Sequence, residues 1–366
     1  MKKILFISNG FAEDLVAITL IKELSNIKAD AEIYCLPIVG NAKHFADLNV
    51  KIIGPHWELP SEGLNYGNLG LHVGDFFGGQ LALVLGQLIS LAIRRKQFDL
   101  IVCVGDYVNS AAAAITLQKA PIVHVWVCPA YYCPGFVKKH LEKKCKTIYL
   151  RDSEVDDLDE IAVEKKFVGN PLMDTFEING EGFGLNGNNP TIGVLPGSRK
   201  VVYKNLPLLL EILQGIYRIR RANILFALSP KIDKKEFTQA SKKLNGWSDD
   251  YMLTYNFGDV LKESDIIIGL ARTANEQALA MGKPVVTFWG IGHAMERRLV
   301  KSHANKVLKG NVLYLRPKAE DITSSVLSLL DDPEKMDEMS KKGREIMGPR
   351  GGSKTIARDI KKLLEG

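Results

Sequence analysis

The sequence lacks the cysteine patterns of disulfide-rich and zinc-binding proteins. Its five cysteines are scattered and odd in number, and no two of them form a C-x-x-C pair. A zinc knuckle or a disulfide framework would need regularly spaced pairs. We therefore expect free thiols in a reducing cytosol. The cysteines are Cys35, Cys103, Cys128, Cys133 and Cys145.

Three further sequence signatures are also absent. No G-x-G-x-x-G follows a strand pattern, so a dinucleotide-dependent dehydrogenase is not supported. No basic stripe is interleaved with aromatic residues, which disfavours nucleic acid as a partner. The apolar run at residues 4–7 is short and Glu13 and Asp14 soon follow it, which favours a buried first strand over a secretory signal.

The composition is that of a globular protein with room for two domains. The chain has 366 residues, of which 46% are hydrophobic and 25% are charged. A formal net charge of +6 favours acidic partners such as phosphates or anionic lipids.

Short apolar runs alternate with amphipathic helical stretches along the whole chain. Most runs are continuous in Val, Ile and Leu, as in parallel strands that helices cover on both faces. This alternation predicts an α/β protein with two doubly wound, Rossmann-like sheets. The predicted strands are 3–8, 31–36, 100–104, 122–127, 147–150 and 166–168, then 191–195, 223–227, 251–254, 266–268, 284–288 and 312–314.

A glycine- and asparagine-rich stretch divides the chain. Residues 177–190 read EINGEGFGLNGNNP, which predicts a linker about which the domains could close. We expect one Rossmann-like domain at 1–176, a second at 191–346 and a terminal segment at 347–366. Within that segment we expect a helix from Ser353, its N-cap, to Leu364, which returns to the first domain. The ligand cleft is expected between the carboxyl edges of the two sheets.

One segment is unusually apolar. Residues 74–93 read GDFFGGQLALVLGQLISLAI and are followed by Arg94-Arg95-Lys96. The polar residues within it favour a buried helix, with a membrane-facing surface as the alternative and a spanning helix as the least favoured. Residues 138–146 contain five lysines, which predicts a solvated helix face or, beside an apolar surface, a contact with anionic headgroups.

Two segments in the second half are suited to a nucleotide diphosphate. Residues 191–200 read TIGVLPGSRK, in which Gly197 allows close backbone approach, Ser198 offers a hydroxyl and Arg199 can bind a phosphate through two hydrogen bonds. Residues 271–276 then open a helix after a buried strand. Small residues there, Thr273, Ala274 and Asn275, leave helix-start amides accessible, and Glu276 could bind ribose hydroxyls or form a capping box with Thr273.

Two segments in the first half are candidates for the acceptor side. The turn after the first strand carries Asn9, Gly10, Glu13 and Asp14, which could hold an acceptor, although the two carboxylates could equally stabilise a helix dipole. Asp106 stands at the carboxyl end of a buried strand. It is a candidate general base, with a turn-capping role as the alternative.

Three segments follow one another in a characteristic order: FVGNPLMD at 167–174, LPGSRK at 195–200, and TANE at 273–276 with GKPVV at 282–286. Together they resemble the lipid-A-disaccharide synthase family, which carries V-G-H-P-L-x-D, L-P-G-S-R and T-A-x-x-E segments. The similarity is clear over about residues 166–290 and thin over the N-terminal half. Asn170 stands where the family has His, and residues 9–14 and 105–109 depart from the family's patterns.

The resemblance implies a GT-B fold and an inverting transfer that needs no metal and no cofactor, since the UDP-sugar is a co-substrate. The family moves an acylated glucosamine from its UDP carrier to a lipid-linked sugar phosphate. Its members work on the cytoplasmic side of the bacterial inner membrane. On this analogy 1–176 is the acceptor-binding domain and 191–346 is the UDP-sugar-binding domain. Ser198 and Arg199 would bind the donor diphosphate, Glu276 its ribose, Asp106 would act as base, and Asn170 would lie on the acceptor side. Residues 74–96 and 138–146 would then contact the membrane.

Two other functions fit the same pattern. A UDP-GlcNAc 2-epimerase shares the two-sheet layout but needs no lipid acceptor, so the apolar segment and the lysine run argue against it. A non-catalytic nucleotide-sugar-binding protein would bind UDP without turnover.

Overall fold

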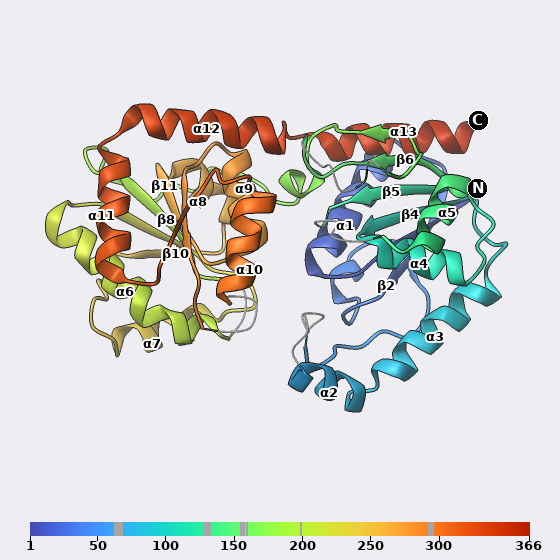
Figure 1. Cartoon of the computed structure of the whole chain (residues 1–366), viewed down its shortest axis with the longest axis horizontal. Coiled ribbons are helices and arrows are strands. Elements are labelled where there is room, and N and C mark those ends of the chain that lie inside the picture. The colour runs from blue at the N-terminus through green and yellow to red at the C-terminus, as the bar shows by residue number, and fades with distance from the viewer. Residues whose placement is uncertain (62–68, 128–132, 154–157, 159, 198–199, 292–295) are drawn as a thin grey trace. The chain divides into compact units, whose positions relative to one another are not determined.

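The computed structural model of the chain describes residues 1–61, 69–127, 133–153, 158, 160–197, 200–291 and 296–366. The chain divides into two compact units (Figure 1). Unit 1 comprises Met1–Thr175 and Gly348–Gly366, and unit 2 comprises Phe176–Met347.

Unit 1 is built around a parallel sheet in which seven strands are described. Their order is β3-β2-β1-β4-β5-β6-β7. The strands are β1 Lys2–Ser8, β2 Ala31–Pro37, β3 Lys51–Ile52, β4 Leu100–Gly105, β5 Ile122–Trp126, β6 Cys145–Tyr149 and β7 Lys165–Lys166. The helices are α1 Phe11–Asn26, α2 Leu69–Phe77, α3 Gln80–Ile93, α4 Tyr107–Ile115, α5 Gly135–Lys144 and α13 Gly352–Glu365, with short turns η1 Lys43–Phe45 and η2 Pro171–Asp174.

Unit 2 repeats this design with a six-stranded parallel sheet in its described part. The strand order is β10-β9-β8-β11-β12-β13. The strands are β8 Thr191–Leu195, β9 Asn223–Ala227, β10 Met252–Thr254, β11 Ile266–Gly269, β12 Val285–Phe288 and β13 Leu313–Leu315. The helices are α6 Val202–Ile219, α7 Lys234–Lys242, α8 Phe257–Glu263, α9 Arg272–Ala280, α10 Arg297–Ser302, η4 His303–Val307, α11 Ala319–Leu330 and α12 Pro333–Met347.

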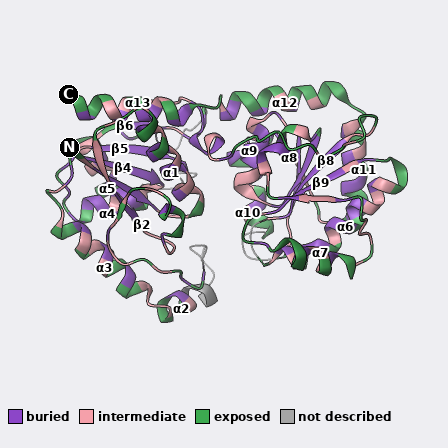
Figure 2. Ribbon diagram, turned by 180° about the vertical axis from the view of Figure 1, so that it is seen from behind, coloured by how far each residue is buried: buried purple, intermediate pink, exposed green. Residues whose placement is uncertain are grey.

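The predicted doubly wound architecture is confirmed. The central strands of both sheets are buried along their whole length, as Figure 2 shows. Their continuous apolar runs are explained by helices on both faces, which leave no solvent-facing side to carry polar residues. The twelve predicted strands overlap β1, β2 and β4–β13, whereas the two-residue β3 was not predicted because so short a strand carries no apolar run.

The C-terminal helix returns to unit 1, as predicted. Helix α13 packs against α1 and buries Ile356, Ala357 and Ile360. The prediction of Ser353 as its N-cap is wrong, because Gly351 occupies that position in a left-handed conformation that glycine adopts without strain.

The glycine- and asparagine-rich stretch at 177–190 is attached to unit 2. The Asp259 carboxylate accepts hydrogen bonds from the backbone amides of Asn179 (3.2 Å) and Gly180 (2.9 Å). Further along, Thr254 donates to the Glu181 carboxylate at 2.7 Å. The segment has no regular secondary structure, yet side chains of unit 2 fix its path.

The favoured prediction of a buried helix at 74–93 is wrong. The segment forms two helices, α2 and α3, which are separated at Gly79, a residue with a left-handed backbone conformation. Their outer faces are exposed: Phe76 and Phe77 are 62% and 83% exposed. The other exposed apolar side chains here are Val73, Leu81, Val84, Leu85, Ile89 and Ile93. Among the described helices, none is both long and apolar enough to cross a membrane.

Buried polar groups hold this exposed pair of helices to unit 1. The Asp75 carboxylate accepts from the Ser61 amide at 2.9 Å. The Gln87 amide donates to the carbonyl oxygens of Pro37 and Pro55, each at 3.2 Å. Asp75 and Gln87 therefore serve as anchors on the inner face, together with the buried Leu83 and Leu91, while most of the large apolar side chains face solvent.

Candidate functional site

Each sheet contains one point where the strand order reverses. In unit 1 it lies between β1 and β4, and in unit 2 between β8 and β11. Ligands of doubly wound sheets bind outside the carboxyl ends of the strands at such points. The four candidate segments predicted from the sequence are the turns that directly follow β1, β4, β8 and β11. Because β1 pairs with β4 and β8 pairs with β11, each unit brings two of these segments side by side.

In unit 1, a hydrogen-bond network connects the turn after β1 with the start of α4. Asn9 donates to Asp106 Oδ1 at 2.8 Å, and Asn109 donates to Asn9 Oδ1 at 3.3 Å. Asp106 is also the N-cap of α4 and accepts from the Val108 amide at 2.9 Å, again through Oδ1. The turn-capping role is therefore present in the structure.

Gly105 makes the close approach of these side chains possible. Its φ of +140° disfavours other residues. A Cβ at this position would collide with the Asn9 side chain and would lie 2.7 Å from Asn109 Nδ2. Burial raises the pKa of the Asp106 carboxyl, against the opposing effect of the hydrogen bonds from Val108 and Asn9.

Asp14 points into unit 1 and away from solvent. It is 3% exposed and accepts a hydrogen bond from Ser8 Oγ at 2.5 Å. Burial raises the pKa of its carboxyl to about 7, and the Ser8 hydrogen bond opposes that rise. Its neighbour Glu13 is partly exposed and folds over Gly10, where an added Cβ would meet the Glu13 carboxylate. The two adjacent carboxylates thus occupy different environments.

Asn170 lies in a buried turn that secures the C-terminal helix. It is the N-cap of η2 and accepts from the Leu172 amide at 3.0 Å. At the other end of η2, the Asp174 carboxylate accepts from the amides of Gly351 (2.6 Å) and Ser353 (2.8 Å). The V-G-N-P-L-x-D segment therefore caps the start of α13.

In unit 2, the turn after β8 lies against the start of α9. Gly197 has a φ of +105°, and a Cβ there would be 3.8 Å from the Leu270 carbonyl oxygen. The predicted donor residues Ser198 and Arg199 lie outside the described residues. The N-cap of α9 is Ala271, whose side chain has no hydrogen-bond acceptor. Among the described residues, the start of α9 therefore has no hydrogen bond from an N-cap side chain, an arrangement suited to an anion.

The capping-box alternative for Thr273 and Glu276 is wrong. Helix α9 begins at Arg272, so Thr273 lies inside its first turn, where it and Ala274 are partly exposed. Asn275 is buried and donates to the Gly269 carbonyl oxygen at 3.3 Å. It therefore holds the helix start to the end of β11.

Glu276 is engaged by a residue that the sequence did not suggest. Its Oε1 accepts from His303 Nε2 at 2.9 Å, and each residue is 6% exposed. Oε2 is buried as well and, within the described part of the chain, has no hydrogen-bond partner. His303 comes 27 positions later, on η4. No local motif marks it, which is why sequence reasoning missed it.

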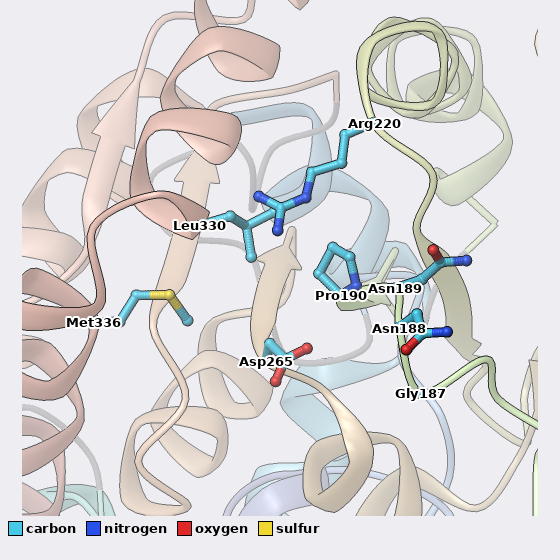
Figure 3. Close-up of a pocket in the computed structure, with 8 residues that line it drawn as sticks. All are labelled: Gly187, Asn188, Asn189, Pro190, Arg220, Asp265, Leu330 and Met336. Atoms are coloured by element: carbon cyan, nitrogen blue, oxygen red, sulfur yellow. The ribbon is translucent and has the colours of Figure 1, made fainter.

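A surface pocket of about 310 Å³ lies at the opposite edge of the unit 2 sheet (Figure 3). It adjoins the residues that precede β8, β9 and β11, so it is at the amino ends of these strands. Arg220 pairs with Asp331 at 2.7 Å, and Asp265 accepts from the Thr191 amide at 2.8 Å. Its charged groups are thus satisfied within the protein. The lining residues are Gly187, Asn188, Asn189, Pro190, Arg220, Asp265, Leu330 and Met336.

Comparison with curated proteins finds similarity to lipid-A-disaccharide synthases. The chain is 27% identical over 249 residues to lipid-A-disaccharide synthase 2 of Legionella pneumophila (strain Philadelphia 1). The aligned region covers 62% of this chain and 64% of that protein. It is 22% identical over 389 residues to lipid-A-disaccharide synthase of Solibacter usitatus. This alignment covers 100% of this chain and 98% of that protein. No family model matches the chain.

Solved structures with the same fold cover nearly the whole chain. Acinetobacter baumannii MurG superposes with a TM-score of 0.65 at 15% identity, covering 99% of this chain and all of that one. UDP-GlcNAc 2-epimerase from Neisseria meningitidis, bound to UDP-GlcNAc, superposes with a TM-score of 0.62 at 15% identity over the full length of both. The GT-B fold and the resemblance to lipid-A-disaccharide synthases are confirmed.

Proposed function

We propose that the chain is an inverting glycosyltransferase that moves a sugar from a UDP-sugar to a lipid-linked acceptor. The observation that carries the proposal is the pair of switch-point sites on a GT-B fold. One combines a glycine turn, an uncapped helix start and a buried carboxylate, and the other presents a half-buried aspartate. An acylated glucosamine as the sugar and a sugar phosphate on lipid as the acceptor are what the family resemblance implies. The curated relatives are named as synthases of the lipid A disaccharide, which supports a product of this kind.

The donor binds to unit 2 in this proposal. Gly197 and the amides at the start of α9 contact the diphosphate, together with Ser198 and Arg199, which follow Gly197 in the sequence. Backbone amides and a guanidinium are the usual ligands of phosphate oxygens. Glu276, one turn into α9, accepts hydrogen bonds from ribose hydroxyls.

The acceptor hydroxyl reacts with the help of Asp106. Asn9 and Val108 both donate to Oδ1, which fixes the carboxylate and allows Oδ2 to take the proton. The hydroxyl oxygen then attacks the anomeric carbon as the bond to UDP breaks, and the charge that develops on the diphosphate is stabilised by the donor site. The raised pKa of Asp106 makes it a stronger base than an exposed aspartate.

The lipid contact is assigned to the exposed face of α2 and α3. A face with many large apolar side chains is costly in water and marks an interaction surface. Basic residues lie next to it: the Lys119 amide donates to the Arg95 carbonyl oxygen at 3.0 Å, and Lys144 Nζ donates to the Lys119 carbonyl oxygen at 2.9 Å. Apolar side chains beside clustered cations suit a bilayer with anionic headgroups.

The decisive experiment incubates the purified chain with radiolabelled UDP-sugars and total membrane lipid, then separates the products by chromatography. We expect a labelled glycolipid with the wild type. Arg199→Ala should reduce its formation by about a hundredfold or more, the usual loss when one group that stabilises developing charge is removed. Full activity in that variant would contradict the donor site. An epimerised UDP-sugar formed without lipid would assign the chain to the epimerases, and UDP binding without any turnover would make it a binding protein.

A further inference from the structure

The His303–Glu276 pair has a geometry that suits ligand positioning. A carboxylate oxygen is only an acceptor, so His303 Nε2 is the donor in their 2.9 Å hydrogen bond. That bond involves Oε1 alone. Oε2 is buried and, in the described part of the chain, accepts no hydrogen bond. A buried acceptor without a donor costs free energy. A ligand hydroxyl that donates to such an acceptor removes this cost, and it therefore gains more binding free energy than it would at an exposed carboxylate, which water already solvates.

The backbone around His303 supports this arrangement. Residues His303–Val307 form a π-helical turn directly after α10, and the His303 carbonyl accepts from the Leu308 amide at 3.0 Å. A π turn inserts an extra residue into the helical path and changes the direction of its side chains. Here it places a buried imidazole against the carboxylate of α9, a helix distant in sequence.

We infer that His303 is a positioning residue for the UDP ribose. By holding Oε1 it fixes the rotamer of Glu276, so that Oε2 is ready to accept from the ribose hydroxyls. The inference rests on the proposed donor site, and it adds a residue that does not itself touch the ligand. Without the imidazole, no hydrogen bond to Oε1 fixes the side-chain torsions of Glu276, and ribose binding must restrict them instead.

The test is calorimetric titration of the full chain with UDP and with 2′,3′-dideoxy-UDP, which lacks the ribose hydroxyls. His303→Ala should weaken UDP binding by about tenfold, the scale of one hydrogen bond to a charged group, and leave dideoxy-UDP binding unchanged. His303→Gln should restore most of the UDP affinity, because its amide nitrogen can occupy the place of Nε2. His303→Asn, whose amide is too short, should behave like His303→Ala and serves if the alanine variant does not fold.

Two controls separate the inference from the donor site and from folding. Asn305→Ala changes an exposed residue of the same turn and should bind both nucleotides like the wild type. Glu276→Ala should lose the preference for UDP over dideoxy-UDP. If it does so while His303→Ala and His303→Asn keep that preference, or weaken both nucleotides equally, His303 is not a positioning residue. If Glu276→Ala keeps the preference, the ribose assignment in the proposed function is itself wrong.

Discussion

Asp106 combines a structural and a proposed chemical role in one carboxylate. Its Oδ1 caps α4 by accepting from the Val108 amide, and the same oxygen accepts a hydrogen bond from the Asn9 side chain. An asparagine keeps an acceptor oxygen and is as good an N-cap as aspartate, but it cannot take a proton. Replacing this aspartate by asparagine therefore separates the cap from the base.

Asp106→Asn should reduce glycolipid formation by roughly a hundredfold or more, as expected when a general base is lost. Its thermal midpoint and its affinity for UDP should match those of the wild type. Because burial raises the pKa of Asp106, the wild-type rate should rise with pH through a value above the usual aspartate range. Full activity in the Asp106→Asn variant would remove Asp106 from the reaction.

Asp14 makes the stability of unit 1 depend on pH. Its pKa is about 7 in the folded chain, against 3.8 as the ordinary value, because burial disfavours the charge. Between these values the folded state binds more protons than the unfolded state, so the free energy of unfolding falls as pH rises. Stability from this group is greatest below its ordinary pKa and is lost as pH rises towards about 7.

Asp14→Asn should flatten this dependence, because the amide accepts the Ser8 hydrogen bond without a charge. Urea unfolding followed by circular dichroism at several pH values measures the slope. The loss in the wild type should be of the order of 1.4 kcal/mol for each pKa unit of the shift. Asp30→Asn, which alters an exposed carboxylate of the same unit, should keep the wild-type slope. Parallel curves for wild type and Asp14→Asn would show that Asp14 does not titrate in this range.

Asp174 joins two segments that are far apart in the chain. Its two oxygens accept from amides at the start of α13, next to a close contact in which a Cβ on Gly169 would collide with the Pro349 carbonyl oxygen. Asp174→Ala should lower the free energy of unfolding by about 1 kcal/mol, the typical value of a helix cap. Asp174→Asn should lose less, since one acceptor remains. Equal stability of wild type and Asp174→Ala would contradict the capping role.

The strands were predictable because their continuous apolar runs differ clearly from the amphipathic and polar segments between them. The position of the candidate site residues could also be predicted. They lie in the turns after the strands, and parallel strands place their carboxyl ends at one edge of the sheet. What could not be predicted depends on long-range packing. Asp174 finds its amides 177 and 179 positions away, and His303 meets Glu276 across 27 positions. Local patterns contain no trace of such contacts.

The burial of helices α2 and α3 was wrongly predicted for a different reason. An apolar run is compatible with a buried core and with an exposed docking surface, and periodicity does not distinguish them. The two glycines at 78 and 79 divide the run, and Asp75 and Gln87 turn one face inward. Whether an apolar helix is buried is decided by what the rest of the fold leaves available to cover it.

The face of α2 and α3 should bind anionic bilayers. Phe76→Ser with Phe77→Ser should weaken binding to phosphatidylglycerol-containing vesicles by about a hundredfold or more, since each phenyl ring contributes roughly 1.5 kcal/mol or more when it leaves water. Co-sedimentation measures the affinity. Ile219→Ser, which removes an exposed apolar residue of unit 2, is the matched control and should bind normally. Unchanged binding by the double variant would exclude this face as the lipid contact.

The two units differ in how the chain builds them. Unit 2 is one continuous segment, Phe176–Met347, and its linker stretch is fixed to its own side chains. Unit 1 is made of two segments, because α13 follows the whole of unit 2 and then packs on α1. The stability of unit 1 therefore depends on the last residues of the chain, whereas the core of unit 2 is complete at Met347.

A chain that ends at Met347 should lose stability in unit 1 alone. Removing α13 exposes the surface of α1 that Ile356, Ala357 and Ile360 cover, at a cost of roughly 1.5–3 kcal/mol for each large side chain, and leaves the Asp174 cap without its helix. Differential scanning calorimetry should show one transition moved to lower temperature and one unchanged, with the UDP-dependent stabilisation confined to the unchanged one. A chain that ends at Leu364 keeps the buried face of α13 and should melt like the full-length protein. If truncation at Met347 lowered both transitions equally, the two units would not be independent cores.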